Sequence, residues 1–185
     1  SGVRPLFDDG QGNASKATRD YVLELKNADT APLLNIYGGK ITTFRKLSEA
    51  VMEKLYPQTT AQNWTAKEPL PGGDFEVDGV PKLIQSLCDR YRFLDHTWAH
   101  RLATHYGTEA FKLLGDHQER SDLGHNFGEN LTEAEVRWLM EHEFAMSAED
   151  ILWRRTKLGL RLNQAQQSAL ALWIEELTSQ DRNKK

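Results

Sequence analysis

Apolar residues recur with two different periods along this chain, and the change of period separates a first part from a second. Residues 21–25 alternate apolar and polar side chains, which is the two-residue period of a half-buried strand. A short apolar run over residues 32–37 ends at Gly38 and Gly39, which predicts a buried strand and a tight turn. Residues 44–55 then carry apolar side chains at helical spacing. The first part is therefore predicted to be strand, glycine turn and helix.

The second part has the period of amphipathic helices throughout. Predicted helices begin at or near Gly79, Asp95, Ala110, Thr132, Ser147 and Asn163. The connections between them are short, which favours an orthogonal or antiparallel cluster of about five helices. A stretch rich in proline and glycine, residues 57–79, connects the two parts. The expected fold is mainly α, with a helical domain over residues 61–180 and a small β/α unit over residues 1–60.

Capping residues and apolar stripes give the helices of the second part more detail. Thr132 and Glu135 fit a capping box, in which the threonine oxygen accepts from an early backbone N–H and the glutamate reaches back. The apolar face expected on that helix is Val136, Leu139, Met140 and Phe144. The helix after Ser147 is expected to run to Gly159. The buried face expected on the last helix is Ala169, Leu170, Trp173, Ile174 and Leu177.

Composition narrows the class of protein. The chain has 185 residues, 39% hydrophobic and 27% charged, which excludes a disordered or fibrous protein. No apolar run approaches the roughly 20 residues that span a bilayer. A single cysteine, Cys88, excludes a disulfide framework and a thiolate zinc cluster within these residues, and it fits a reducing compartment. The net charge of −4 argues against nucleic acid as a partner. Residues 1–60 carry +1 and the remainder −5, so an anionic ligand is expected in the first part.

The strongest local signal for chemistry is the run Gly38, Gly39, Lys40, Ile41, Thr42 and Thr43. Glycines let backbone N–H groups turn toward a ligand, and the helix that follows presents the positive end of its dipole. Lys40 adds a full positive charge, so the segment can stabilise a phosphate or a group that develops negative charge. The pattern is neither a Walker loop nor a dinucleotide fingerprint. The alternative is an ordinary glycine turn with a solvated lysine.

Other side chains are weaker candidates. The forked side chains of Arg4 and Arg19 match phosphate and, together with Lys40, could form a phosphate pocket, although surface arginines are more often solvated. On the predicted helix after Asp95, the histidines are His96, His100 and His105, which lack a zinc motif, so no metal site is expected. Cys88 is expected to be a buried structural thiol. Arg154 to Lys157 are read as compensation of a helix dipole with salt bridges.

Six short blocks together resemble the FAD-dependent glycerol-3-phosphate dehydrogenases. They are SGVRPL (1–6), TRDY (18–21), GGKITTFRK (38–46), LPGG (70–73), SDLG (121–124) and LWRRTK (152–157). Their order and spacing match the bacterial aerobic branch over essentially the whole chain. The resemblance implies the last third of a longer protein, so we expect a fragment or a processed product. Residues 1–60 would be the remainder of the FAD- and substrate-binding domain, and residues 61–180 a helical cap domain.

The resemblance also implies a reaction and its binding residues. The parent enzyme would oxidise sn-glycerol 3-phosphate to dihydroxyacetone phosphate by hydride transfer to FAD and pass the electrons to a membrane quinone. Arg4 and Arg19 would hold the substrate phosphate with Lys40, and the segment Gly38–Thr43 would face the flavin. The parent would lie on the cytoplasmic face of the inner membrane as a peripheral protein. The isolated fragment is expected to be inactive and to hold no stable FAD.

Two other functions stay open at this point. One is a glycerol-3-phosphate oxidase that reoxidises its flavin with O2, because its motifs would look alike. The other is a non-catalytic helical interaction module, which could describe the cap domain alone. No catalytic base can be named, no nucleic acid partner is expected, and a homodimer is left open.

Overall fold

A computed structural model describes residues 7, 20–26, 31–58 and 64–182 of the chain, with side chains as far as residue 179. The chain divides into two compact units between Glu68 and Pro69. Unit 1 is the part before this division and unit 2 is the part after it. Each unit has its own architecture.

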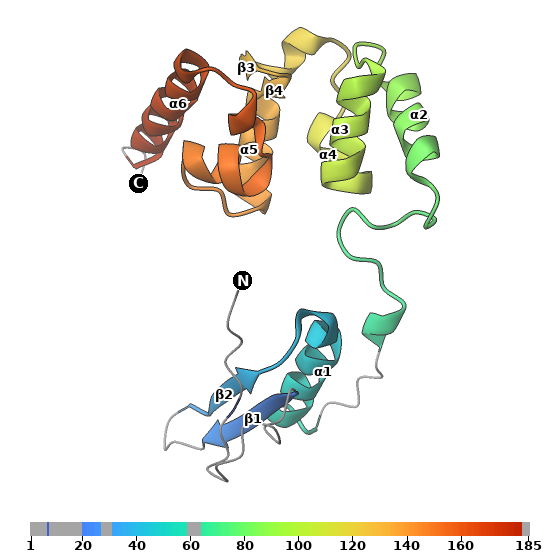
Figure 1. Ribbon diagram of the computed structural model, residues 1–185, viewed down its shortest axis with the longest axis vertical. Helices are drawn as coiled ribbons and strands as arrows, with labels where there is room; N and C mark the ends of the chain where they lie inside the picture. Colours follow the sequence, from blue (N-terminus) through green and yellow to red (C-terminus); the bar gives the residue numbers. More distant parts are fainter. Residues whose placement is uncertain (1–6, 8–19, 27–30, 59–63, 183–185) are drawn as a thin grey trace. The chain divides into compact units, whose positions relative to one another are not determined.

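Unit 1 is a β-hairpin followed by a helix (Figure 1). Strands β1 (Tyr21–Lys26) and β2 (Leu33–Gly38) pair antiparallel, with Tyr21 opposite Gly38. A 3-10 turn, Ile41–Thr43, leads into helix α1 (Phe44–Leu55). This confirms the predicted order of strand, glycine turn and helix. A second 3-10 turn, Trp64–Ala66, follows later.

Unit 1 exposes apolar side chains that a complete core would cover. None of its described residues is buried, and Leu33 is 57% exposed. The expectation of a buried strand over residues 32–37 is therefore wrong for this chain. The other large apolar side chains exposed on the hairpin and helix are Ile36, Tyr37, Ile41, Phe44, Met52 and Tyr56. Two strands and one helix give a hairpin too few neighbours to bury its faces.

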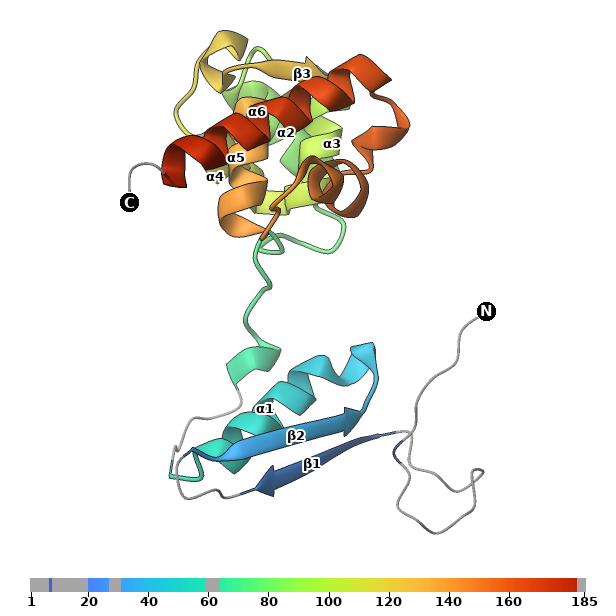
Figure 2. The same cartoon turned by 90° about the vertical axis from the view of Figure 1, so that its left-hand side faces the viewer.

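Unit 2 is a helical cluster with one very short hairpin (Figure 2). Its α-helices are α2 (Val80–Arg90), α3 (His96–Tyr106), α4 (Ala110–Leu114), α5 (Glu133–His142) and α6 (Gln164–Arg182). Its strands are β3 (Asn126–Gly128) and β4 (Leu131–Thr132). The shorter helical pieces are 3-10 turns at Gly107–Glu109, Arg120–Leu123 and Leu158–Leu160 and a π-helix at Asp150–Arg155. The mainly α fold with a small β/α part is confirmed.

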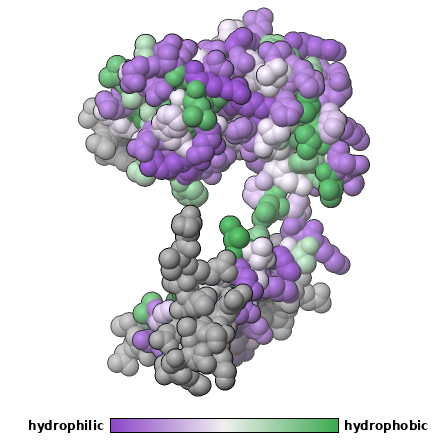
Figure 3. Space-filling model, viewed as in Figure 1, coloured by the Kyte–Doolittle hydropathy of each residue, from purple (hydrophilic) through white to green (hydrophobic). Residues whose placement is uncertain are grey.

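One hydrophobic core joins the elements of unit 2. Examples of fully buried side chains, one from each of α2, α3, α4, α5, the π-helix and α6, are Leu87, Leu102, Leu114, Leu139, Ile151 and Leu170. Each such burial contributes about 1.5–3 kcal/mol relative to exposure. On the face shown in Figure 3, the hydrophobic residues of unit 2 lie in separate patches among hydrophilic ones. No helix in the described residues is long and apolar enough to cross a bilayer.

The end of α5 differs from the sequence prediction. The helix stops at His142, and Phe144 adopts a positive φ of 57° and is 85% exposed. The expected apolar face therefore ends at Met140, and Ala145 enters the core in place of Phe144. The left-handed backbone at Phe144 changes the direction of the chain, so that Phe144 faces outward and Ala145 faces the core.

The helix expected from Ser147 to Gly159 is shorter and wider than predicted. It becomes a π-helix at Asp150 and ends at Arg155. The hydroxyl of Thr156, itself buried, donates to the carbonyl of Ile151 at 2.7 Å, and Lys157 takes a left-handed φ of 60°. The side-chain hydroxyl thus satisfies a carbonyl at the end of the helix.

Two smaller features were not predicted. Between β3 and β4, Glu129 and Asn130 have φ values of 50° and 60°, the pattern of a two-residue hairpin turn. Ala169, expected on the buried face of α6, is exposed, whereas Leu170 and Ile174 are buried as expected.

Candidate functional site

The predicted ligand segment leaves β2 through two glycines with positive φ. Gly38 has φ 71° and Gly39 has φ 95°, values that side chains with a Cβ rarely adopt. A Cβ on Gly38 would lie 3.1 Å from the carbonyl oxygen of Asp20, the residue just before β1. Glycine at these positions therefore lets the chain turn sharply beside β1 and begin a helix at once.

Lys40 is the last extended residue before this helix. Its carbonyl accepts hydrogen bonds from the backbone N–H and the hydroxyl of Thr43, each at 3.0 Å. Its side chain is exposed, and within the described ranges it makes no ion pair or hydrogen bond. An open glycine turn, a helix start and an uncommitted ammonium fit the anionic edge of a ligand such as a flavin or a phosphate.

The other two predicted phosphate ligands, Arg4 and Arg19, lie outside the described residues. The structure therefore brings Gly38, Gly39, Lys40, Ile41, Thr42 and Thr43 into one turn. The convergence of the arginines with that turn stays a prediction.

A buried polar cluster in unit 2 was missed by sequence reasoning. The guanidinium of Arg101 on α3 donates to both carboxylate oxygens of Glu135 on α5, at 2.5 and 2.7 Å. The hydroxyl of Tyr106 donates to the same carboxylate at 2.7 Å, and Arg101 also donates to the carbonyl of Asn130 at 3.0 Å. Burial, followed by the charge of Glu135, raises the pKa of Tyr106 well above its ordinary value.

This cluster corrects the predicted capping box. The hydroxyl of Thr132 accepts from the N–H of Glu135 at 3.4 Å, as expected. The carboxylate of Glu135, however, does not reach back along the helix but points to Arg101 and Tyr106, and the side chain is only 1% exposed. A carboxylate three residues after a threonine has the same sequence pattern in both cases, so the pattern could not distinguish them.

The LPGG block has a structural role in unit 2. The N–H of Thr108 donates to the carbonyl of Gly72 at 3.0 Å, which ties the connecting segment to the end of α3. A Cβ on Gly107 would overlap the backbone of Gly72, and one on Gly72 would overlap the carbonyl of Tyr106. Glycine at both positions therefore allows two stretches of backbone to touch.

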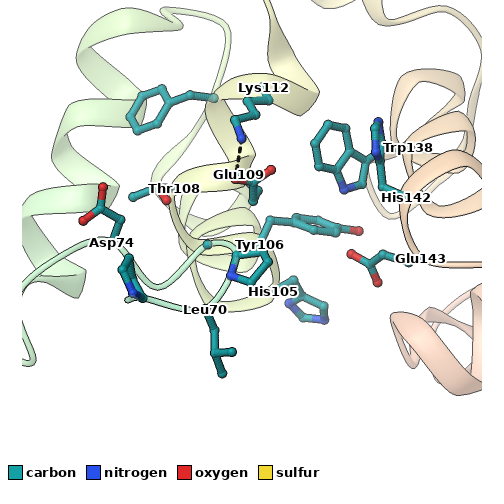
Figure 4. Close-up of a pocket in the computed structure, with 14 residues that line it drawn as sticks. Leu70, Asp74, His105, Tyr106, Thr108, Glu109, Lys112, Trp138, His142 and Glu143 are labelled. Carbon is teal, nitrogen blue, oxygen red and sulfur yellow. Dashed lines mark hydrogen bonds and ion pairs between the residues drawn. The ribbon is translucent and has the colours of Figure 1, made fainter. Parts of the chain in front are cut away.

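A pocket of about 780 Å³ lies beside this crossing, wholly within unit 2 (Figure 4). Residues 69–72 and Asp74 form one wall with the end of α3 and the start of α4. Trp138, His142 and Glu143, from the end of α5, form the opposite wall. The His105 ring faces backbone carbonyls of Arg101 and Thr156, at 2.9 and 3.4 Å. Sequence reasoning could not predict this pocket, because its walls come from separate segments of the chain.

The SDLG block has a local explanation. The carboxylate of Asp122 accepts from the backbone N–H groups of Gln118 and Glu119, each at 2.9 Å, and these hydrogen bonds lower its pKa. A Cβ on Gly124, which has φ 74°, would collide with the side chain of Glu133. The block therefore closes a 3-10 turn against α5.

The basic run 154–157 is largely engaged in local contacts. Arg154 pairs with Glu149 and Asp150, and Arg155 donates to the carbonyl of Glu143 at 2.9 Å. These contacts support the interpretation that the basic run compensates the helix dipole and forms salt bridges.

Cys88 is half-buried, and burial raises the pKa of its thiol, which disfavours the nucleophilic thiolate. Among the residues that the structure describes, no group of three or more histidine, cysteine and acidic side chains could hold a metal ion.

Comparison with known proteins gives a consistent family. A family model described as the C-terminal domain of alpha-glycerophosphate oxidase matches residues 63–180. D-erythritol 1-phosphate dehydrogenase of Brucella abortus is 44% identical over 178 residues, which cover 95% of this chain and 35% of that protein. Glycerol-3-phosphate dehydrogenase of Pseudomonas aeruginosa shows the same identity and coverage, and the aerobic enzyme of Escherichia coli K12 is 44% identical over 183 residues. The chain spans about a third of the length of these relatives.

Proposed function

Because this chain belongs to the family of the C-terminal domain of alpha-glycerophosphate oxidase, we propose that it is the C-terminal part of an FAD-dependent dehydrogenase of sn-glycerol 3-phosphate. The single observation that carries this proposal is 44% identity, over nearly the whole chain, to proteins named glycerol-3-phosphate dehydrogenase. The product of the reaction is dihydroxyacetone phosphate.

The chemistry that FAD supplies, when bound, is acceptance of a hydride from the substrate carbon. The residues of this chain that would hold it are Gly38, Gly39, Lys40, Ile41, Thr42 and Thr43. Their turn presents backbone and an ammonium group to an anionic edge, where negative charge develops during the reaction. Arg4 and Arg19, with Lys40, hold the substrate phosphate, and this remote binding energy positions the carbon that reacts.

D-erythritol 1-phosphate is a second candidate substrate. The relative that oxidises it, by its name, is as similar to this chain as the two glycerol-3-phosphate dehydrogenases are, each at 44% identity. Both substrates are phosphate monoesters of a polyol, so the same three cationic side chains would serve either. Selectivity between them then depends on the residues that face the sugar alcohol rather than the phosphate.

The acceptor and the location follow from the dehydrogenase class. We propose a membrane quinone as the electron acceptor, with the whole protein bound peripherally to the cytoplasmic face of the inner membrane. An oxidase that uses O2 is the competing function, and the family model's description mentions such an oxidase. Release of hydrogen peroxide during turnover of the whole protein separates the two.

These 185 residues alone should neither hold FAD nor oxidise the substrate. No dinucleotide fingerprint occurs in the sequence, and the hairpin of unit 1 leaves apolar side chains uncovered. The purified chain is mixed with FAD and desalted, and its spectrum and dye reduction with glycerol 3-phosphate are measured. A yellow chain that reduces the dye would refute this part of the proposal.

Substitution of Arg4 tests the substrate site in the whole protein. Arg4→Ala should raise KM for the phosphorylated substrate roughly tenfold or more, because a charged hydrogen-bond partner of the phosphate is lost. Lys40→Met should act in the same direction. Lys46→Met is the matched control, because Lys46 pairs with Glu49 on α1 at 2.8 Å. An unchanged KM in both test variants would contradict the assignment of Arg4 and Lys40 to the substrate phosphate, and no turnover even in the unmodified whole protein would favour a non-catalytic module.

A further inference from the structure

The pocket of unit 2 has the size and walls of a small-molecule site. Its volume of about 780 Å³ lies in the range of ligand pockets, which is about 300–1,000 Å³. The backbone holds both walls in place. The hydrogen bond from Thr108 to Gly72 holds one wall, and the end of α5 forms the other. Its residues have no part in the chemistry proposed for Gly38–Thr43.

An aromatic surface lines the side formed by α5. Trp138 is partly buried, and the ring of His142 lies against it with centroids 4.0 Å apart (Figure 4). Tyr106 borders the same space, with its hydroxyl held by Glu135. The faces of indole and phenol rings attract flat apolar groups and cations.

The charges on the walls favour a cation. The acidic side chains that line the pocket are Asp74, Glu109 and Glu143, and its one lysine or arginine is Lys112. Lys112 pairs with Glu109 at 2.8 Å, so each compensates the other. Two carboxylates then remain without a lysine or arginine in the lining.

Glu143 is the carboxylate best placed beside the aromatic surface. Figure 4 shows its side chain directed toward Tyr106, below Trp138 and His142. Arg155 donates to the backbone carbonyl of Glu143 and fixes the residue, but in the described part of the chain no hydrogen bond or ion pair reaches the carboxylate. The charge of Glu143 contributes to the raised pKa of Tyr106, in agreement with this proximity.

We propose that this pocket binds a small organic cation, with its apolar body against Trp138 and its amine, amidine or guanidine group on Glu143. Residues 69–72, the first residues of unit 2, line the pocket, so a bound cation would contact them directly. The proposal uses none of the residues assigned to the dehydrogenase reaction and does not depend on that reaction.

The test uses three probes of one shape and different charge. Benzamidine is cationic, benzamide neutral and benzoate anionic, and each is titrated into the whole 185-residue chain at pH 8, where an ordinary histidine is neutral. The readout is the indole N–H signal of Trp138 in a nitrogen-15 NMR spectrum, assigned with Trp138→Phe. Benzamidine should shift this signal with a dissociation constant in the millimolar range, and benzamide and benzoate should bind more weakly.

Glu143→Gln supplies the decisive comparison. It should weaken benzamidine binding about fivefold and leave benzamide unchanged, because the amidinium loses its ion pair and keeps only a hydrogen bond to a neutral amide oxygen. Glu141→Gln is the matched control, since Glu141 lies two residues away, is exposed and does not line the pocket. The proposal would be overturned if benzoate bound as tightly as benzamidine, or if no probe shifted the Trp138 signal. It would also be overturned if Glu143→Gln bound benzamidine as tightly as the unmodified chain.

Discussion

At the scale of single residues, a buried carboxylate connects the helices of unit 2. Glu135 receives three hydrogen bonds from two side chains of α3, and the guanidinium that donates two of them also fixes the turn at Asn130. Taking a carboxylate out of water is costly, and these donors offset that cost. The sequence identified Glu135 as a polar residue with a partner but assigned the wrong partner, because pairing across 34 residues is set by tertiary packing.

Removing this charge should destabilise unit 2 strongly. Glu135→Gln leaves the guanidinium of Arg101 buried without its counter-charge, so the free energy of unfolding should fall by about 3 kcal/mol. Glu133→Gln is the control, because Glu133 pairs with Arg137 nearer the surface and should cost at most about 1 kcal/mol. Urea unfolding followed by circular dichroism measures both. Equal losses in the two variants would show that the buried pair has no special role.

Asp150 should make the free energy of unfolding of unit 2 fall at low pH. Its carboxylate accepts from the backbone N–H groups of Met146 and Ser147, and these bonds, with the Ser147 hydroxyl and Arg154, lower its pKa. A carboxyl group whose pKa is lower in the folded than in the unfolded state stabilises the fold at any pH above its unfolded pKa, which is near 4. This stabilisation is lost as the pH falls through the folded-state pKa.

The measurement is the urea midpoint between pH 7 and pH 2. Asp150→Asn should be less stable at pH 7 and should lose less stability on acidification than the unmodified chain. Asp116→Asn serves as the control, since the Asp116 carboxylate is fully exposed and, among the described residues, contacts one cation, Arg90 at 3.4 Å. Parallel curves for Asp150→Asn and the unmodified chain would rule out this contribution.

At the scale of elements, local signals predicted helices and strands well and their ends less well. Asp95 caps α3 and Asn163 accepts from Gln166 at the start of α6, as the sequence indicated, because caps act within one turn. The π-helix, the reversal at Phe144 and the hairpin β3–β4 were not predicted. Each depends on contacts distant in sequence or on a left-handed residue other than glycine, which composition does not show.

The backbone crossing of the connecting segment gives a prediction at this scale. Gly107 and Gly115 have nearly the same backbone angles, φ 54° with ψ −132° and −134°. A Cβ on Gly107 would overlap Gly72, whereas the nearest atom to one on Gly115 would be 3.8 Å away. Gly107→Ala should therefore cost about 2 kcal/mol more than Gly115→Ala, which carries the backbone strain alone.

Hydrogen exchange identifies the cause. In Gly107→Ala the N–H of Thr108, which donates to Gly72, should exchange faster, while the same N–H in Gly115→Ala stays protected. Similar unfolding free energies for the two variants would contradict a close backbone contact.

At the scale of the whole molecule, the two units have unequal cores. Unit 2 buries side chains from all five of its α-helices and from its π-helix, whereas no described residue of unit 1 is buried. The turn Gly38–Thr43 could be predicted from the sequence because glycines, strand and helix start are adjacent there. The pocket and the Arg101–Glu135 pair could not, because they form only when α3 and α5 pack together.

Amide exchange should therefore separate the units. The hydrogen-bonded amides of β1 and β2 should exchange through openings of low free energy, while those in the middle of α3 and α5 exchange near the global unfolding free energy of unit 2. Equal protection of the hairpin and of α3 would contradict the view that unit 1 lacks a core of its own.

We propose that the chain forms part of a flavin-dependent polyol-phosphate dehydrogenase. The most direct measurement is the visible spectrum of the whole protein that contains this chain, recorded without oxygen before and after glycerol 3-phosphate is added, with D-erythritol 1-phosphate in a parallel sample. We expect a bound flavin that bleaches with at least one of the two substrates. A colourless protein, or a flavin that neither substrate reduces, would contradict it.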